Sequence, residues 1–252
     1  MKLGIYLNAQ HPKGDDPGRR FAETIEQVRL IRQLGFDSIW SGEHHITNGF
    51  HYYPLLPMLQ RLAAEAAGLE IGTNIVLLPL HNPMELAETG AFLDVITGGK
   101  FNLGVGLGYR PEEFAMFGVP IKERVSRLVE GVEIIKRLWT EDGVTHKGRH
   151  WQFENMTIRP QPAKKPRPPI MIAAHVDAAV ERAARVADGW CIVPTPRLEV
   201  VAALMDQHRT GITHVTMRTS WPGMKQDDVL AGIELLGTKV LPEVRRRIAA
   251  GA

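Results

Sequence analysis

Short apolar segments alternate with amphipathic stretches along most of this chain. Residues 3–7 have the composition of a buried strand, and residues 17–34 show apolar side chains at helical spacing up to Gly35, a residue type that commonly ends helices. The same reasoning predicts further strands at 38–40, 71–78, 101–107, 170–174, 189–193 and 213–217. It predicts further helices at about 55–67, 83–97, 120–140, 177–187, 196–208 and 225–249. Strands that alternate with helices pair in parallel, because each helix returns the chain to the same end of the sheet.

This alternation predicts an α/β fold of the (β/α)8 TIM-barrel type, formed by a single domain over residues 1–252. The pattern contains one strand fewer than a closed barrel, so one strand–helix unit is missing before the last strand. The gap falls between Gln207 and Gly211, where a helix would run almost directly into that strand. Either the printed sequence omits a stretch at this point or the barrel is a shortened one. Residues 143–169, rich in proline and aromatic side chains, are expected to form an excursion over the barrel surface.

The composition of the chain argues against several classes of function. A chain of 252 residues with 44% hydrophobic and 23% charged residues fits one globular domain, and its net charge of +2 is too weak and dispersed for a nucleic-acid partner. No apolar stretch approaches the roughly 20 residues that span a bilayer, and no leader precedes the first strand, so a cytoplasmic protein is expected. The single cysteine, Cys191, excludes an internal disulfide and fits a buried thiol in a reducing compartment.

Chemically useful side chains follow the predicted strands at the end where a parallel barrel places its active site. Glu43, His44 and His45 come after the second strand, Tyr109 after the fourth and His175 after the fifth. The histidine pair allows three interpretations: a metal site, a hydrogen-bonded structural residue, or an acid–base group. Adjacent histidines on a strand end point to opposite faces, and no HxH or HExxH spacing accompanies them, so no metal is expected. The residues alone leave the structural and the acid–base interpretations open.

Two further segments are candidate ligand contacts. At the junction before the helix at 177–187, His175, Val176 and Asp177 precede free helix amides that attract phosphate, although Asp177 could itself cap the helix. The glycines at 104, 106 and 108 do not form a dinucleotide fingerprint, because no helix starts within the motif; they are expected to leave room for a planar ligand. Three aromatic residues are either pocket walls or core, and their character hints at a hydrophobic substrate: Tyr52, Tyr53 and Trp190.

Several motifs in order resemble the luciferase-like flavin-dependent monooxygenase family. They are GFDSIWSGEHH at 35–45, IGTNIVLLP at 71–79, HNP at 81–83 through to Asp94, GKFNLGVGLGYRPEEF at 99–114, and RAARVADGW at 182–190. The resemblance extends over roughly 1–205 and returns at about 211–249. It implies a barrel that binds reduced flavin at its mouth, usually as a homodimer.

The resemblance also implies residue roles. His44 matches the acid–base histidine of the family, and the bond between Asn74 and Ile75 matches a non-proline cis peptide that supports the flavin ring. His175, Val176 and Asp177 match the flavin phosphate site. Gly106 and Tyr109 are assigned to the cofactor, whereas Glu43, Tyr52, Tyr53 and Trp190 are assigned to the substrate pocket. Leu107 stands where the light-emitting members have a basic phosphate partner, which argues against light emission.

The resulting hypothesis is a monooxygenase that uses reduced FMN and O₂ on a small organic substrate, with the flavin supplied by a separate reductase. A hydride-transfer oxidoreductase that uses the deazaflavin coenzyme F-420 is the main alternative. We lean to FMN, because Glu43-His44 differs from the Asp-His pattern common in the deazaflavin branch. Two further alternatives are a non-catalytic flavin-binding or partner subunit, which loss of the flavin-covering loop near the gap would favour, and a metal-dependent hydrolase.

Overall fold

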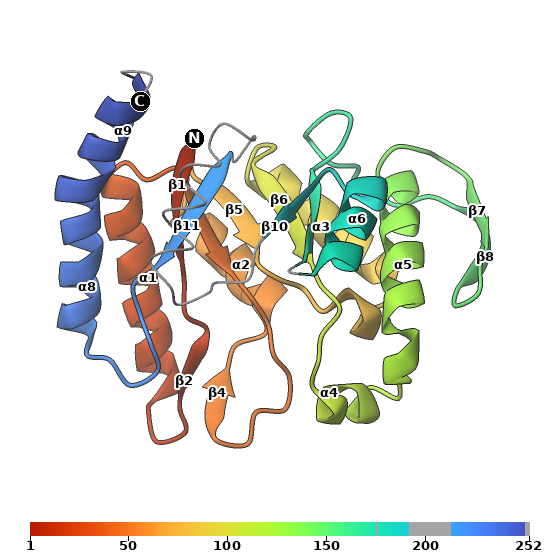
Figure 1. Ribbon diagram of the computed structural model, residues 1–252, viewed down its shortest axis with the longest axis horizontal. Helices are drawn as coiled ribbons and strands as arrows, with labels where there is room; N and C mark the ends of the chain where they lie inside the picture. Colours follow the sequence, from red (N-terminus) through yellow and green to blue (C-terminus); the bar gives the residue numbers. More distant parts are fainter. Residues whose placement is uncertain (175, 192–212, 250–252) are drawn as a thin grey trace.

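The molecule is built around one curled sheet of parallel strands (Figure 1). The computed structural model describes residues 1–174, 176–191 and 213–249. Within these residues the sheet has seven strands in the order β10-β9-β6-β5-β3-β1-β11. The strands are β1 (Lys2–Tyr6), β3 (Ser38–Ser41), β5 (Glu70–Thr73), β6 (Phe101–Val105), β9 (Ile170–Ala173), β10 (Gly189–Cys191) and β11 (His214–Arg218). The α/β class and the parallel pairing therefore follow the prediction.

The order of the strands matches their order in the chain, except that the last strand lies beside the first. Lys2 to Tyr6 pair in register with His214 to Arg218, so β11 returns the chain to β1. This is the curl of a barrel with β10 and β11 at the two ends of the described sheet. The predicted helix at 196–208 and the gap between Gln207 and Gly211 lie outside the described residues.

Helices cover the outer face of the sheet. They are α1 (Pro17–Gln33), α2 (Leu55–Ala63), α3 (Pro83–Ile96), α5 (Arg124–Leu138), α6 (Asp177–Val186), α8 (Gln226–Leu235) and α9 (Leu241–Ala249). Local sequence explains several ends: the Asp16 carboxylate accepts from Arg19 N at 2.6 Å before Pro17, and Asn82 caps α3 in the same way before Pro83. α8 and α9 are joined by a π-helical turn, Leu236–Val240, where Gly237 packs closely on Leu34.

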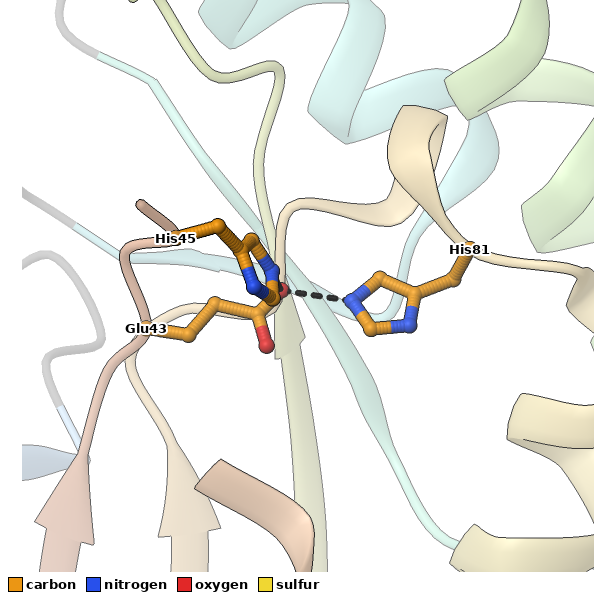
Figure 2. A group of neighbouring side chains, drawn as sticks. All are labelled: Glu43, His45 and His81. Atoms are coloured by element: carbon orange, nitrogen blue, oxygen red, sulfur yellow. Dashed lines mark hydrogen bonds and ion pairs between the residues drawn. The ribbon is translucent and has the colours of Figure 1, made fainter. Parts of the chain in front are cut away.

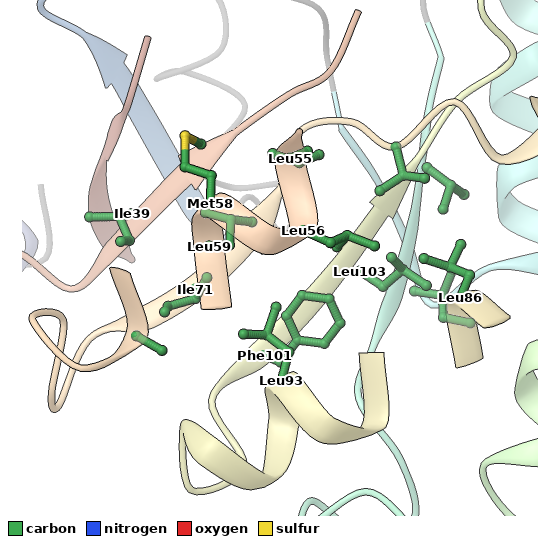
Figure 3. Packing of buried hydrophobic residues seen from close by; sticks show 14 of the residues in the cluster. Ile39, Leu55, Leu56, Met58, Leu59, Ile71, Leu86, Leu93, Phe101 and Leu103 are labelled. Atoms are coloured by element: carbon green, nitrogen blue, oxygen red, sulfur yellow. The ribbon is translucent and has the colours of Figure 1, made fainter. Parts of the chain in front are cut away.

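The hydrophobic core lies between the sheet and these helices (Figure 3). Ile39, Ile71 and Phe101 point from neighbouring strands toward helix side chains such as Leu59 and Leu93, and all five are fully buried. Because side chains alternate along a strand, the residues between them face the barrel interior. Tyr6 and Trp40 are register partners on that inner face, and Arg218 continues the row on β11.

The structure adds elements that the periodicity did not predict. β2 (Gln10–Pro12) and β4 (Phe50–Tyr52) form an antiparallel pair, and α4 (Pro111–Met116) follows β6; all three lie at the lower edge in Figure 1. The excursion at 143–169 contains the hairpin of β7 (Val144–Lys147) and β8 (Gln152–Met156). The strand predicted at 71–78 ends at Thr73, because the apolar run after it continues into a 3-10 turn, Leu78–Leu80.

No helix among the described ranges combines the length and the apolar character needed to cross a membrane.

Candidate functional site

His44 lies at the mouth formed by the carboxyl ends of the strands, in the loop after β3. Its Nδ1 is 3.1 Å from Oε1 of Glu113, a fully buried carboxylate on α4. The same oxygen accepts hydrogen bonds from His45 N at 2.8 Å and from Arg110 Nη1 at 3.3 Å. The rings of Tyr52 and Tyr109 stand edge-on to the imidazole, each with its centroid 5.8 Å away. His44 is therefore oriented by a carboxylate and two aromatic rings.

This geometry defines the proton positions on the neutral His44 ring. A carboxylate only accepts hydrogen bonds, so Nδ1 carries the proton that is donated to Glu113. Nε2 is then the unprotonated nitrogen, and none of the described residues donates to it. A half-exposed imidazole with one fixed and one open nitrogen can accept a proton from a ligand and return it.

A second cluster lies next to this pair (Figure 2). Oε1 of Glu43 accepts from Leu77 N at 2.6 Å and from His81 Nε2 at 2.7 Å, while His45 Nε2 is 3.7 Å away. Burial by itself would raise the pKa of Glu43, but the neighbouring imidazoles of His45 and His81 lower it to about 2. Burial would lower the pKa of His81, yet the Glu43 carboxylate more than offsets this and raises it. The cluster ties the loop after β3 to the turn after β5.

The ligand atoms of Glu43, His45 and His81 all lie within 4.8 Å of one another, a spacing that a divalent cation could use. Glu43 Oε1, however, already accepts two short hydrogen bonds. A cation there would have to displace His81 from that oxygen. We therefore interpret the cluster as an ion-pair network that supports the loop, and Glu43 as a buried anchor beneath the mouth rather than a wall of a substrate pocket.

The other predicted pocket residues separate into two groups. Tyr52 lies in the site against His44, whereas Tyr53 packs on Phe21 and donates its hydroxyl to Pro17 O at 2.6 Å, which fixes it to α1. Trp190 is the register partner of Ile172, so it lies on the helix-facing side of the sheet, with 46% of its surface exposed. Tyr53 and Trp190 are thus not part of the mouth. The hydrogen bond to Pro17 O holds Tyr53 against α1, and the alternation of side chains along β10 places Trp190 on the helix-facing side of the sheet.

The predicted cofactor residues are placed as follows. The peptide bond between Asn74 and Ile75 is cis, as the resemblance implied. Gly106 does not leave an open space: an added Cβ would lie 2.0 Å from Ile75 Cδ1, so this glycine makes room for the Ile75 side chain. Tyr109 is 70% exposed beside His44. Val176 is the N-cap of α6 without any side-chain cap, Asp177 is the first helical residue, and His175 lies outside the described residues.

Sequence reasoning assigned no role to four residues of this mouth: Tyr6, Arg110, Glu113 and Arg218. Arg110 and Glu113 lie in the GKFNLGVGLGYRPEEF motif at 99–114, but nothing in that motif indicated that α4 folds back and places Glu113 beside His44. Tyr6 and Arg218 end the first and last strands, so the rule that singles out strand ends would have found both.

A cavity of about 790 Å³ lies between α5 and the β7–β8 hairpin, lined by residues such as Ser126, Glu130 and His146. None of the mouth residues lines it. Glu130 accepts hydrogen bonds there from His150 N, Trp151 N and His146. These bonds attach the β7–β8 hairpin to α5.

Comparison with known proteins gives three kinds of match. The model of the luciferase-like monooxygenase family matches residues 1–217. The oxygenase component of a flavin-dependent trigonelline monooxygenase from Acinetobacter baylyi is 34% identical over 180 residues, 69% of this chain and 49% of that protein. An F420-dependent glucose-6-phosphate dehydrogenase from Amycolatopsis mediterranei is 30% identical over 176 residues, 67% of this chain and 52% of that protein.

The fold itself matches solved structures. The crystal structure of the monooxygenase RslO1 from Streptomyces bottropensis superposes with a TM-score of 0.84 at 22% identity, covering 97% of this chain and 100% of that one. The chain spans about half the length of the curated relatives it matches. The likeness in fold to RslO1, by contrast, extends over nearly the whole of both chains.

Proposed function

The chain belongs to the luciferase-like monooxygenase family, and we propose that it is a flavin-dependent oxidoreductase, a monooxygenase that uses reduced FMN and O₂ on a small organic substrate. The observation that supports this most directly is the His44–Glu113 pair at the barrel mouth. A buried carboxylate that orients one imidazole nitrogen and leaves the other open is the arrangement of an acid–base residue. A relative named as a flavin-dependent monooxygenase supports the reaction class.

The residues present fit a flavin. Ile75, packed into the space beside Gly106, offers an apolar support for a planar ring. α6 begins without a capping side chain, so the amides of Asp177 and Ala178 at its start can meet a phosphate. Ile75 and Tyr109 would contact the ring, and the backbone at Val176 and Asp177 would meet the phosphate. The bound reduced flavin would supply the electrons that activate O₂ for transfer of one oxygen atom to the substrate.

The chain itself would manage the proton. His44 Nε2 accepts a proton from the reacting group and returns it, while the carboxylate of Glu113 stabilises the charged imidazole through Nδ1. The rings of Tyr52 and Tyr109 stand edge-on to the imidazole and help to fix its orientation. We expect the reduced flavin to come from a separate reductase, and the protein to act as a homodimer.

Hydride transfer with the deazaflavin coenzyme F-420 is the second candidate. Relatives at 30–34% identity are named as F420-dependent dehydrogenases, so the family contains both chemistries. The same histidine would then take the proton of an alcohol that is oxidised.

An anaerobic titration separates the two candidates. The protein is titrated with reduced FMN and, in parallel, with reduced F-420, and each complex is then mixed with aerated buffer in an oxygen electrode. We expect reduced FMN to bind in the micromolar range and the complex to consume oxygen faster than free reduced FMN does. Tighter binding of F-420 without oxygen consumption would favour hydride transfer. Binding of neither coenzyme would contradict both.

A further inference from the structure

Arg218 ends β11 on the inner face of the barrel, at the same mouth as His44. Its register partner on β1 is Tyr6, and its guanidinium carbon lies 5.6 Å from the centre of the Tyr6 ring. The same carbon also lies over the Trp221 ring, 4.2 Å from the ring centroid. Two aromatic faces therefore hold the plane of the guanidinium, which leaves its edge as the part that can contact a ligand.

The hydrogen bonds of Arg218 leave part of that edge unused. Nε donates to Ser220 O at 3.0 Å, and Nη2 donates to Asn8 Oδ1 at 3.1 Å. A guanidinium has five N–H donors, and none of the ion pairs among the described residues gives Arg218 a carboxylate. Two other partly buried arginines do have carboxylate partners: Arg20 pairs with Asp15 and Glu23, and Arg167 pairs with Asp188 through two nitrogens.

A continuous polar surface joins Arg218 to His44. The hydroxyl groups of Tyr6 and Tyr52 lie near enough to influence each other's pKa, and the Tyr52 ring stands edge-on to His44. Burial raises the pKa of both tyrosines, so both hydroxyls are neutral and can donate. The other charge near Tyr52 is Glu43, which is already paired with His81. The net unpaired charge on this wall is therefore the positive charge of Arg218.

We propose that Arg218 is a specificity-determining residue that binds the acid group of a small organic anion, so that the substrates of the site are carboxylates or similar acids. A carboxylate fits the planar, bidentate edge of a guanidinium better than any neutral group does. Anchored there, the body of the acid extends along Tyr6 and Tyr52 toward His44. This inference rests on the proposed function for the reaction, although anion binding itself can be measured without any flavin.

The test is calorimetric titration of the purified full-length protein with benzoate and, as the neutral analogue of the same shape, benzyl alcohol. We expect benzoate to bind at least about tenfold more tightly than benzyl alcohol, the factor that one charged hydrogen bond provides. Arg218→Met is expected to abolish this preference, and Arg218→Lys, which retains the charge but not the fork, to keep part of it. The matched control is Arg32→Met, which removes the same charge from the exposed last turn of α1.

Equal affinity of the wild type for benzoate and benzyl alcohol would overturn the proposal, as would undiminished benzoate binding by a folded Arg218→Met protein. The wild-type comparison stays decisive if that variant does not fold. A third outcome concerns the coenzyme: if Arg218→Met weakens reduced FMN but not benzoate, the arginine faces the flavin and the proposal is wrong. Benzoate binding that depends on Arg218 in a protein that binds neither flavin would instead contradict only the proposed function.

Discussion

At the scale of single residues, the arrangement around His44 separates orientation from proton transfer. Nδ1 is held by Glu113, and Nε2 is the nitrogen left for a ligand. We predict that His44→Ala lowers turnover by about 10²–10⁴-fold, the usual contribution of a general acid–base group, without changing the affinity for reduced flavin. His51→Ala is the control, since His51 Nε2 bonds to Lys13 O instead. Unchanged steady-state turnover in His44→Ala would show that another group moves the proton.

Glu113 is a positioning residue, and its charge and its geometry can be tested separately. In Glu113→Gln the amide oxygen can still accept from His44 Nδ1 and His45 N, so we expect kcat to fall only about tenfold, from the loss of charge. Glu113→Ala loses the orientation as well and should cost at least about a hundredfold, with KM for the flavin unchanged. Glu112→Gln, at the exposed neighbouring position on α4, should match the wild type. A parallel rise in KM for both variants would indicate a purely structural role.

At the scale of elements, the Glu43–His81 ion pair joins the loop after β3 to the turn after β5. Removing one partner of a buried pair leaves the other uncompensated, so Glu43→Gln should lower the free energy of unfolding by about 3 kcal/mol at neutral pH. Glu88→Gln, at an exposed position on α3, should have no measurable effect.

The pH dependence of this pair has a definite sign. The pKa of Glu43 is about 2 in the folded protein, below its ordinary value of 4.5, so its contribution is complete above pH 4.5 and is lost as the pH falls toward 2. The pKa of His81 is raised, so its contribution is complete below its ordinary value of 6.5 and is lost as the pH rises through the higher folded value. Urea unfolding of the wild type and Glu43→Gln from pH 2 to 9 should show two curves that converge at acid pH. Parallel curves would contradict the assignment.

The glycines of the inner face allow strands and side chains to approach closely. A Cβ on Gly104 would lie 2.0 Å from the carbonyl oxygen of Thr73, so Gly104→Ala must push β6 away from β5. We expect a loss of about 3 kcal/mol in the free energy of unfolding, measured by urea titration. Gly14→Ala, where a Cβ meets nothing within 4 Å, serves as the control. Equal stability of the two variants would mean that the strands adjust without cost.

The elements that the sequence predicted are those with a clear hydrophobic pattern. Ile5, Ile39 and Ile71 lie in strands buried on both faces, which produce unmistakable apolar runs between helices. β2, β4 and α4 have too few residues for any period to show, and they are the elements that complete the mouth. His44 was therefore found from the end of its strand, whereas Glu113 was missed because its place depends on how a short helix folds back.

At the scale of the whole molecule, the first and last segments of the chain form one structural unit. β11 pairs with β1 over five residues, and α8 lies beside α1, where Gln27 donates to Gln226 and Arg20 to Met224 O. Glu70 of β5 contacts both of these end strands, because it accepts from Lys2 Nζ on β1 and its Oε2 lies 2.9 Å from His214 Nε2 on β11. The mouth depends on this closure, because Tyr6 and Arg218 come from the two strands that it joins.

If residues 1–252 form the single domain that the sequence predicts, a destabilising substitution in the last helices must also destabilise the first strands. Ile233 on α8 is fully buried, so Ile233→Ala should lower the free energy of unfolding by about 2–5 kcal/mol. Leu235→Ala, two residues further on the same helix but 60% exposed, should lower it by less than about 0.5 kcal/mol. Far-ultraviolet circular dichroism and tryptophan fluorescence should shift together to one lower midpoint in Ile233→Ala, because a cooperative unit unfolds as a whole. Two unfolding transitions, of which only one shifts in Ile233→Ala, would instead show that the C-terminal helices unfold independently of the rest of the domain. The barrel mouth would then have to be complete without β11 and Arg218.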